Sequence, residues 1–174
     1  MKLEPLHIIG GLMAFALLAP RRGNASTSLN SSGMSYLGRN DLPRGIRNNN
    51  PGNLRISSSP WQGKIPIAQN TDGAFEQFVN YSYGIRAMTK LLINYIQSGR
   101  NTISSILYRY APPSDNNDTA AYVRAVATAT GIGPETPLTV NRSVLQRLVI
   151  AMAKHENGRD AITSTQFNTA WNLL

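Results

Sequence analysis

The sequence predicts a mainly α-helical domain that carries a small β-hairpin. Three observations support this prediction. From Ser82 onward, apolar residues recur at intervals of three and four, which is the period of an amphipathic helix. Capping residues and Gly or Pro stops divide this part of the chain into separate helices. In the segment 54–79, Gly63, Pro66 and Asp72-Gly73 separate short apolar pieces, a pattern typical of turns between short strands.

Five helices are expected, each with its own start or stop signal. We expect them to extend from Ser82 to the stop at Gly99, from a Thr102 cap to Pro112-Pro113, from an Asp118 cap to Gly131, from Asn141 or Ser143 to Gly158, and from Ser164 through Trp171. Most apolar residues on these helices are expected to form the core.

Composition restricts the chemistry that this chain can perform. Its 174 residues, 41% of them hydrophobic, suffice for one compact domain and an appendage. The absence of cysteine excludes disulfides, thiolate metal sites and cysteine nucleophiles. With only His7 and His155, a multi-histidine zinc site is not expected, and a Ser-His-Asp triad would have to use His155.

The net charge of +8 comes mostly from scattered arginines, which make up 13 of the 17 basic residues. No run of Lys or Arg exceeds two residues, so nucleic acid is not an expected partner. The same charge would attract anionic cell-wall polymers or phospholipid headgroups.

Residues 6–20 form an apolar segment without a full charge at neutral pH. The segment is shorter than the about 20 residues of a spanning helix and close to the hydrophobic region of a signal peptide. Because Arg21-Arg22 follow it, while Lys2 is offset by Glu4, the flanking charges would keep the downstream side cytoplasmic. We interpret residues 1–20 as a membrane anchor in preference to a cleaved signal-like segment, with a buried N-terminal helix as a further alternative. A flexible polar linker is then expected at 21–43 and the folded domain at 44–174.

The run from Arg44 to Arg55 contains four Asn, two Gly and one Pro, which excludes a core helix or a buried strand and predicts a loop. Its amide groups would suit an N-acetylated glycan. We therefore regard four asparagines as candidate substrate-binding residues: Asn48, Asn49, Asn50 and Asn53. The alternative is a surface turn held by its own Asx hydrogen bonds.

Glutamate is scarce, and Glu156 and Glu76 are the candidate general acids. Glu156 lies at the C-terminal end of a predicted helix, where the helix dipole and partial burial would favour the protonated carboxyl. The alternative is a solvated carboxylate that pairs with Lys154 or Arg159. Glu76 or Asp72 in the predicted hairpin could supply the second carboxylate of a glycosidase, although Asp72-Gly73 is equally a turn signal. Aromatic residues near the hairpin, including Trp61, could stack on sugars or belong to the core.

After the run 45–55 come, in order, Trp61-Gln62-Gly63, the pair Phe75 and Phe78, Tyr110-Ala111-Pro112-Pro113 and Asn116-Asn117. This ordered set resembles a group of phage virion proteins, and the likeness covers about two thirds of the chain, from Arg44 to Gly158. The resemblance implies a location in the virion, with other virion proteins as partners.

A second likeness involves Thr119-Ala120-Ala121-Tyr122-Val123-Arg124-Ala125-Val126 and the stretch 150–158, which ends His155-Glu156-Asn157-Gly158. These stretches resemble the tyrosine-bearing helix and the acid helix of lysozyme-like lytic transglycosylases. The resemblance implies a lysozyme-like α+β fold, with Tyr122 lining a peptidoglycan cleft. In those enzymes the acid helix comes first, whereas Glu156 comes late here, and a circular permutation would reconcile the two orders.

Together the resemblances imply a peptidoglycan-cleaving virion protein, a lytic transglycosylase or muramidase, that is membrane-associated and acts in the host periplasm or cell wall. Glu156, with Glu76 as a possible partner, would be catalytic. This chemistry implies neither a metal nor an organic cofactor. The asparagines would bind substrate together with Trp61, Tyr110, Asn117 and Tyr122. The alternative is a noncatalytic, membrane-tethered virion protein that binds glycan or stabilises the capsid.

Overall fold

The computed structural model describes residues 34–174, which form six α-helices and two short 3-10 helices. In chain order these are α1 (Arg44–Arg47), η1 (Ile67–Gln69), α2 (Tyr81–Gln97), α3 (Ile103–Tyr110), η2 (Pro113–Asp115), α4 (Thr119–Thr130), α5 (Arg142–Asn157) and α6 (Ser164–Trp171). The predicted apolar segment 6–20 and the first part of the predicted linker lie outside the described residues.

The five predicted helices are confirmed as α2 to α6. The side chains of Thr102, Asp118 and Asn141 accept backbone N–H bonds at the starts of α3, α4 and α5, as their sequence positions predicted. Asn80 caps α2 and Thr163 caps α6 in the same way, so these two helices begin within a residue of the expected positions. The helix boundaries therefore follow from local capping signals.

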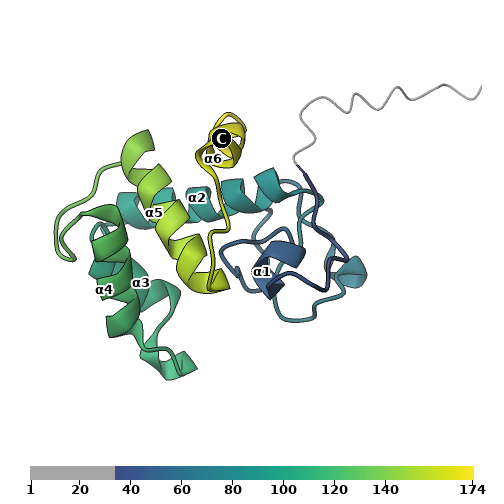
Figure 1. The fold of residues 1–174 in the computed structure, drawn as a ribbon, viewed down its shortest axis with the longest axis horizontal. Helices are drawn as coiled ribbons and strands as arrows, with labels where there is room; N and C mark the ends of the chain where they lie inside the picture. Colours follow the sequence, from purple (N-terminus) through teal and green to yellow (C-terminus); the bar gives the residue numbers. More distant parts are fainter. Residues whose placement is uncertain (1–33) are drawn as a thin grey trace, which may run out of the picture. The chain divides into compact units, whose positions relative to one another are not determined.

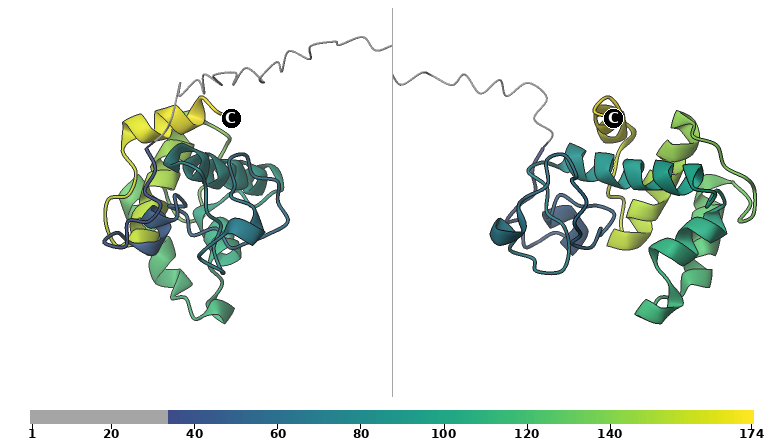
Figure 2. Two further views of the ribbon diagram at one scale, coloured as in Figure 1. Left: turned by 90° about the vertical axis from the view of Figure 1, so that its right-hand side faces the viewer. Right: turned by 180° about the vertical axis from the view of Figure 1, so that it is seen from behind.

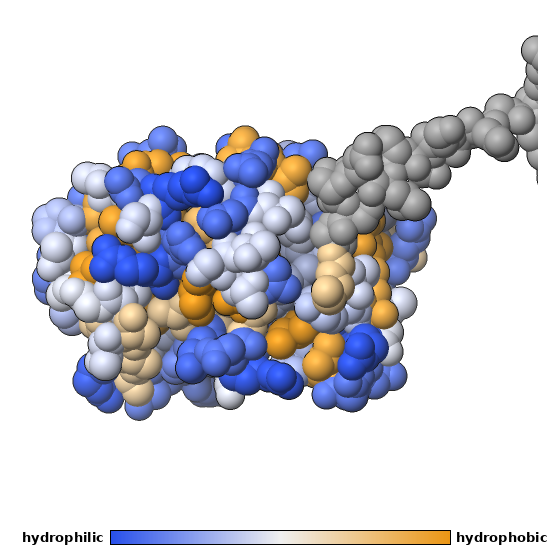
Figure 3. All heavy atoms as spheres, turned by 45° about the horizontal axis from the view of Figure 1, so that its top comes forward, coloured by the Kyte–Doolittle hydropathy of each residue, from blue (hydrophilic) through white to orange (hydrophobic). Residues whose placement is uncertain are grey.

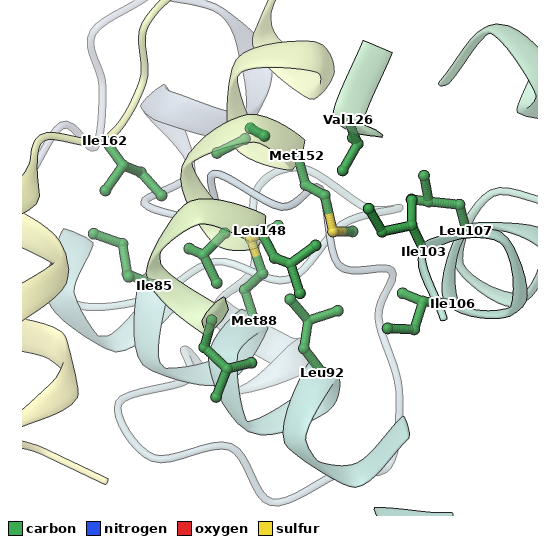
Figure 4. Close-up of a cluster of buried hydrophobic side chains, with 14 of the residues drawn as sticks. Ile85, Met88, Leu92, Ile103, Ile106, Leu107, Val126, Leu148, Met152 and Ile162 are labelled. Atoms are coloured by element: carbon green, nitrogen blue, oxygen red, sulfur yellow. The ribbon is translucent and has the colours of Figure 1, made fainter. Parts of the chain in front are cut away.

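The main core lies where α2, α3, α4 and α5 converge (Figure 4). Met88 and Leu92 of α2 pack with Leu148 and Met152 of α5, and all four side chains are fully buried. At about 25 cal/mol per Å² of apolar surface, burial of such side chains is the main favourable contribution to folding. This core fixes the end of α5, on which Glu156 lies.

The long helix α2 runs through the middle of the domain, and α5 crosses it (Figure 1). Residues 44–80, which contain α1 and η1 and are called the irregular segment below, lie at the N-terminal end of α2 (Figure 2). Helices α3 and α4 lie toward the other end of α2. Helix α5 contacts α4 and α1 and thereby reaches both groups of elements. The C-terminal end of α5 consequently meets the irregular segment.

The β-hairpin predicted for 54–79 is wrong. Arg55 with Phe75 and Lys64 with Phe78 form two isolated antiparallel bridges, and no strand forms within residues 34–174. Backbone pairing is limited to a few hydrogen bonds, such as Glu76 N to Leu54 O at 2.8 Å and Ile65 N to Gln77 O at 2.8 Å. Side-chain amides bond other backbone groups: Asn50 Nδ2 donates to the backbone oxygens of Leu54 and Glu76 at 3.0 and 2.9 Å. The segment is held by isolated backbone pairs and polar side chains and not by a continuous sheet.

Contacts with the helices begin upstream of Arg44, the expected start of the folded domain. The backbone oxygen of Met34 accepts a hydrogen bond from Tyr81 N, and the rings of Tyr36 and Tyr81 pack edge to face. At the other end of the chain, Arg86 Nε donates to Leu173 O at 2.7 Å. Both ends of the described part therefore contact the first two turns of α2.

The exposed hydrophobic residues of the domain are dispersed over its surface. Figure 3 shows several small hydrophobic areas separated by hydrophilic residues on one face. The most exposed large hydrophobic side chains, Met34, Ile67, Val79 and Tyr108, come from different stretches of the chain. Within residues 34–174, no helix is long and apolar enough to cross a membrane.

Candidate functional site

A groove with a volume of about 310 Å³ separates the irregular segment from the connection between α3 and α4. The irregular segment contributes Asn53, Leu54, Arg55 and Phe75; α2 contributes Leu91 and Tyr95; the opposite side is formed by Arg109, Tyr110, Ala111, Pro112, Asp115 and Asn117. Glu156, at the end of α5, completes the lining. Of the two predicted acids, Glu156 lines this groove.

The carboxylate of Glu156 is held from two sides. Asn53 Nδ2 donates to Glu156 Oε2 at 3.0 Å, and the hydroxyl of Tyr122 donates to Oε1 at 2.9 Å. No Lys or Arg of residues 34–174 forms an ion pair with it, and Lys154 pairs instead with Asp160 at 2.8 Å. The alternative of a solvated helix-end glutamate paired with Lys154 or Arg159 is therefore wrong.

The environment of Glu156 makes the carboxyl easier to protonate than that of an ordinary glutamate. Burial raises the pKa of Glu156 above its usual value, whereas the hydrogen bonds from Asn53 and Tyr122 and the nearby His155 oppose this shift. Burial and the proximity of Glu156 also raise the pKa values of Tyr110 and Tyr122 well above normal, so both phenols are neutral donors. A carboxyl with this balance can give up a proton to a ligand and take one back.

The imidazole of His155 stacks on Tyr122, with ring centroids 3.7 Å apart and an interplanar angle of 15°. Tyr122 itself is buried, and its hydroxyl also lies 3.3 Å from Met152 O. Stacking therefore fixes the tyrosine ring whose hydroxyl orients Glu156. Tyr122 thus contacts the carboxylate of Glu156 from the buried interior and is not among the residues that line the groove.

Three of the four predicted glycan-binding asparagines are buried and serve the fold. Asn49 accepts from Tyr36 N at 2.8 Å and donates to Phe78 O at 2.9 Å. Asn48 binds Asp72 and Gln77 through its side chain, and Asn50 binds Leu54 and Glu76. None of the three lines the groove with Glu156. The run is thus neither an exposed turn nor a row of ligand-binding amides, and Asn53 alone of the four reaches the groove.

The backbone explains the composition of this run. Asn49 and Asn53 adopt the left-handed conformation, with φ of 53° and 48°, which Asn tolerates better than most residues. Gly45 packs so closely that a Cβ there would lie 2.6 Å from Asn157 Oδ1 and 2.7 Å from Asn53 Oδ1. A Cβ on Gly84 of α2 would collide with the backbone oxygen of Asn49. The run also opens with the helical turn α1, which the loop prediction did not include.

Asn157 ties the end of α5 to the run. Its Nδ2 donates to Pro51 O and Ala153 O, each at 2.8 Å. The Oδ1 atoms of Asn53 and Asn157 are both buried and have no hydrogen-bond partner within residues 34–174. These contacts bring residue 53 to residue 156 across more than a hundred positions of sequence, which no local pattern could have indicated.

The structure places the other predicted acids away from the groove lining. Glu76 is 0% exposed, and its Oε1 accepts from Lys64 Nζ at 3.0 Å and Ser57 N at 2.9 Å. Asp72 is bound by Arg44 at 2.7 Å, and, although burial opposes it, the hydrogen bonds from Arg44 and Asn48 lower its pKa well below the usual range. Both carboxylates hold the irregular segment together.

The remaining predicted binding residues divide between the groove and the core. Tyr110 lines the groove and its hydroxyl binds the backbone oxygen of Gly52; Asn117 lines the groove and donates to Pro112 O at 3.1 Å. Trp61 packs instead against a small cluster formed by Leu54 and Phe78. The other lining residues were not predicted as site residues; among them Arg55, Tyr95, Arg109 and Asp115 have polar or charged side chains. Arg55 closes the Asn-rich run, and this position was the only signal that pointed to it.

Residues 34–174 contain no cluster of three or more His, Asp or Glu side chains that could hold a metal ion. The groove instead combines the acid Glu156, the amide of Asn53, aromatic side chains and the charged residues Arg55, Arg109 and Asp115.

Over 128 residues the chain is 35% identical to Protein P5 of Pseudoalteromonas phage PM2, and the match covers 71% of this chain and 77% of that protein. The chain belongs to this phage P5 family. No family model matches the chain. The predicted resemblance to phage proteins is therefore supported at the level of this phage relative.

Proposed function

We propose that this P5-family protein is a virion-associated enzyme that cleaves the glycan strand of peptidoglycan, with Glu156 as general acid. The observation that carries the proposal is the position of Glu156 in the groove, where Asn53 and Tyr122 hold it. Its raised pKa, caused by burial, is what a general acid requires near neutral pH.

In the proposed reaction, Glu156 donates its proton to the glycosidic oxygen between N-acetylmuramic acid and N-acetylglucosamine as the C1–O bond breaks. The resulting carboxylate then takes the proton of the muramoyl C6 hydroxyl, whose oxygen bonds to C1. The products are an anhydro end and a free sugar hydroxyl, and Glu156 ends protonated as it began. One carboxyl group suffices for this sequence, which is the lytic transglycosylase outcome.

Hydrolysis would require a second carboxylate to activate water. Glu76 is engaged with Lys64 and Ser57, and this engagement favours the single-carboxylate route. Asp115 also lines the groove, and as the other carboxylate of the lining it is the candidate base if the products prove to be hydrolytic. Product analysis therefore decides between a transglycosylase and a muramidase.

We further propose a lysozyme-like fold in circularly permuted order. Two features support this: Glu156 at the end of α5 meets Asn53 from the beginning of the domain, and both ends of the described part contact α2 near its start. Ends that lie near one another permit permutation. Membrane attachment through residues 6–20, action in the host periplasm or cell wall, and contacts with other virion proteins belong to the same proposal.

A noncatalytic virion protein that binds glycan or stabilises the capsid is the second candidate. It is favoured by the fact that both oxygens of Glu156 already accept hydrogen bonds, which also describes a structural carboxylate. In that case Glu156 would hold α5 against the Asn-rich run.

The test is a zymogram and a turbidity assay on purified bacterial walls with the full-length protein, the Glu156→Gln variant and a matched Glu135→Gln control. Glu135 is exposed and lies outside the groove. We expect Glu156→Gln to lower the rate of lysis by about 100-fold or more, as for loss of a general acid, and Glu135→Gln to leave it unchanged. Mass analysis of the products should reveal anhydro ends. Undiminished lysis by a folded Glu156→Gln variant would rule out the assignment, and wall binding without lysis by the unmodified protein would favour the noncatalytic candidate.

A further inference from the structure

Two arginines line the same groove as Glu156 and come from its two sides. Arg55 follows the Asn-rich run on one side, and Arg109 lies in the last turn of α3 on the other. The side chain of Arg55 is 68% exposed, and Arg109 is exposed as well. The groove therefore presents positive charge to whatever enters it.

Neither guanidinium is strongly engaged by the rest of the domain. Arg55 approaches Asp115 at 3.7 Å, longer than a hydrogen bond, and lies over the ring of Phe75 at 5.6 Å. Arg109 forms no ion pair within residues 34–174. Arg44, by contrast, is bound in two-pronged fashion by Asp72, with both N–O distances 2.7 Å. The donors of Arg55 and Arg109 thus remain available to a ligand.

The charges of the groove select among glycans. When Glu156 is protonated, the lining carries the two arginines against the single carboxylate of Asp115. A neutral N-acetylglucosamine polymer offers no ionic partner to either guanidinium. A muramoyl strand offers ionic partners, because each lactyl group is a carboxylate when free and carries a peptide with further carboxylates when substituted. The planar donors of Arg match a carboxylate in two-pronged geometry.

We infer that Arg55 and Arg109 make this groove selective for carboxylate-bearing glycan strands over neutral ones. The inference rests on the proposed function only in placing a glycan in the groove. Tyr95, which also lines it, supplies aromatic surface for a sugar ring between the charged substituents. The carboxylates can come from the lactyl groups or from the stem peptides.

The test measures binding, so that it does not depend on catalysis. Full-length protein carrying Glu156→Gln is titrated with intact walls, with walls stripped of stem peptides by an amidase, and with neutral N-acetylglucosamine oligomers. Arg55→Gln and Arg109→Gln are introduced singly into this background. Arg124→Gln on α4, an exposed arginine outside the groove, is the matched control. Asp115→Asn provides a change of the opposite sign.

We expect each groove arginine variant to weaken binding to intact walls by about tenfold, the effect of losing one charge-assisted hydrogen-bonding group. Asp115→Asn should tighten it by about threefold, and Arg124→Gln should leave it unchanged. Added salt should reduce the differences. If stripped walls show the same arginine dependence, lactyl groups supply the carboxylates; if only intact walls do, stem peptides supply them.

Equal affinity for neutral oligomers and walls, or binding that is indifferent to both arginines, would overturn the inference. Failure of the proposed enzymatic function would give a different set of results from failure of this inference. If no variant cleaves walls but binding still requires the arginines, the groove is a carboxylate-selective binding site without catalysis. If walls are cleaved and binding ignores the arginines, the enzyme assignment stands and the selectivity does not.

Discussion

Glu76 and Glu156 lie in two regions of the domain that give their carboxyl groups different partners. In the irregular segment, Glu76 is fully buried and is matched by Lys64 and Ser57, so its charge holds loops together. At the end of α5, Glu156 borders the groove, receives hydrogen bonds from neutral groups and has no cationic partner within residues 34–174. Removing one partner of a buried ion pair is destabilising because a charge is left unpaired. A buried carboxyl without a cationic partner is instead more readily protonated than an ordinary glutamate.

The largest effect on stability is expected when the charge of Glu76 is removed. Glu76→Gln leaves Lys64, which is 14% exposed, without its anionic partner, and we expect a loss of about 3 kcal/mol in the free energy of unfolding. Denaturant unfolding measures this loss. A Lys64→Met/Glu76→Leu double variant should recover much of it, because no unpaired charge remains. A loss below about 0.5 kcal/mol, typical of surface positions, would show that the pair does not hold the irregular segment.

A smaller loss of stability is expected for a change at the contact between the irregular segment and the C-terminal end of α5. In Gly45→Ala, the new Cβ would press on the side chains of Asn53 and Asn157, and overpacking of this kind costs about 2 kcal/mol. Because Asn53 binds Glu156, the variant should also impair any function of the groove. Gly73→Ala is the matched control, since its φ of 80° brings backbone strain of about 1 kcal/mol but nothing lies within 4 Å of the added Cβ. Equal effects of the two changes would mean that the close approach at Gly45 is not tight.

The smallest effect, and one of opposite sign, is expected for the stability of Glu156→Gln. Since the folded-state pKa of Glu156 is raised, the stability associated with this carboxyl is fully present below its unfolded pKa, near 4.5, and is lost as pH rises through the folded pKa. Glutamine can keep both contacts, with its oxygen toward Asn53 and its amide toward the Tyr122 hydroxyl. The variant should therefore melt a few degrees higher than the unmodified protein at pH 7, and the difference should vanish at pH 4.

Thermal melts across this pH range distinguish the two glutamates directly. Glu76→Gln should lower the melting temperature where Glu156→Gln raises it. If Glu156→Gln destabilised the protein at pH 7 as much as Glu76→Gln does, Glu156 would be a second structural carboxylate and the noncatalytic candidate would gain support.

Local signals were sufficient for the helices but not for the segment between Leu54 and Val79. Thr102, Asp118 and Asn141 cap helices through neighbouring backbone groups, so their roles are readable from adjacent residues. The same turn-rich composition that suggested a hairpin describes a loop held by distant side chains. Gln77, for example, binds Asn48 across 29 positions, a partner that strand patterns do not indicate.

By itself, the sequence determined the helical class, the extents of α2 to α6, the lack of cysteine chemistry and the short set of possible acids, because these depend on composition and on neighbours within one helical turn. Only the tertiary structure decided that Glu156 reaches the groove with Asn53 while Glu76 is buried against Lys64. It also decided that Asn48, Asn49 and Asn50 face inward. The physical reason is that a side chain's protonation and exposure depend on packing partners that lie far away along the chain.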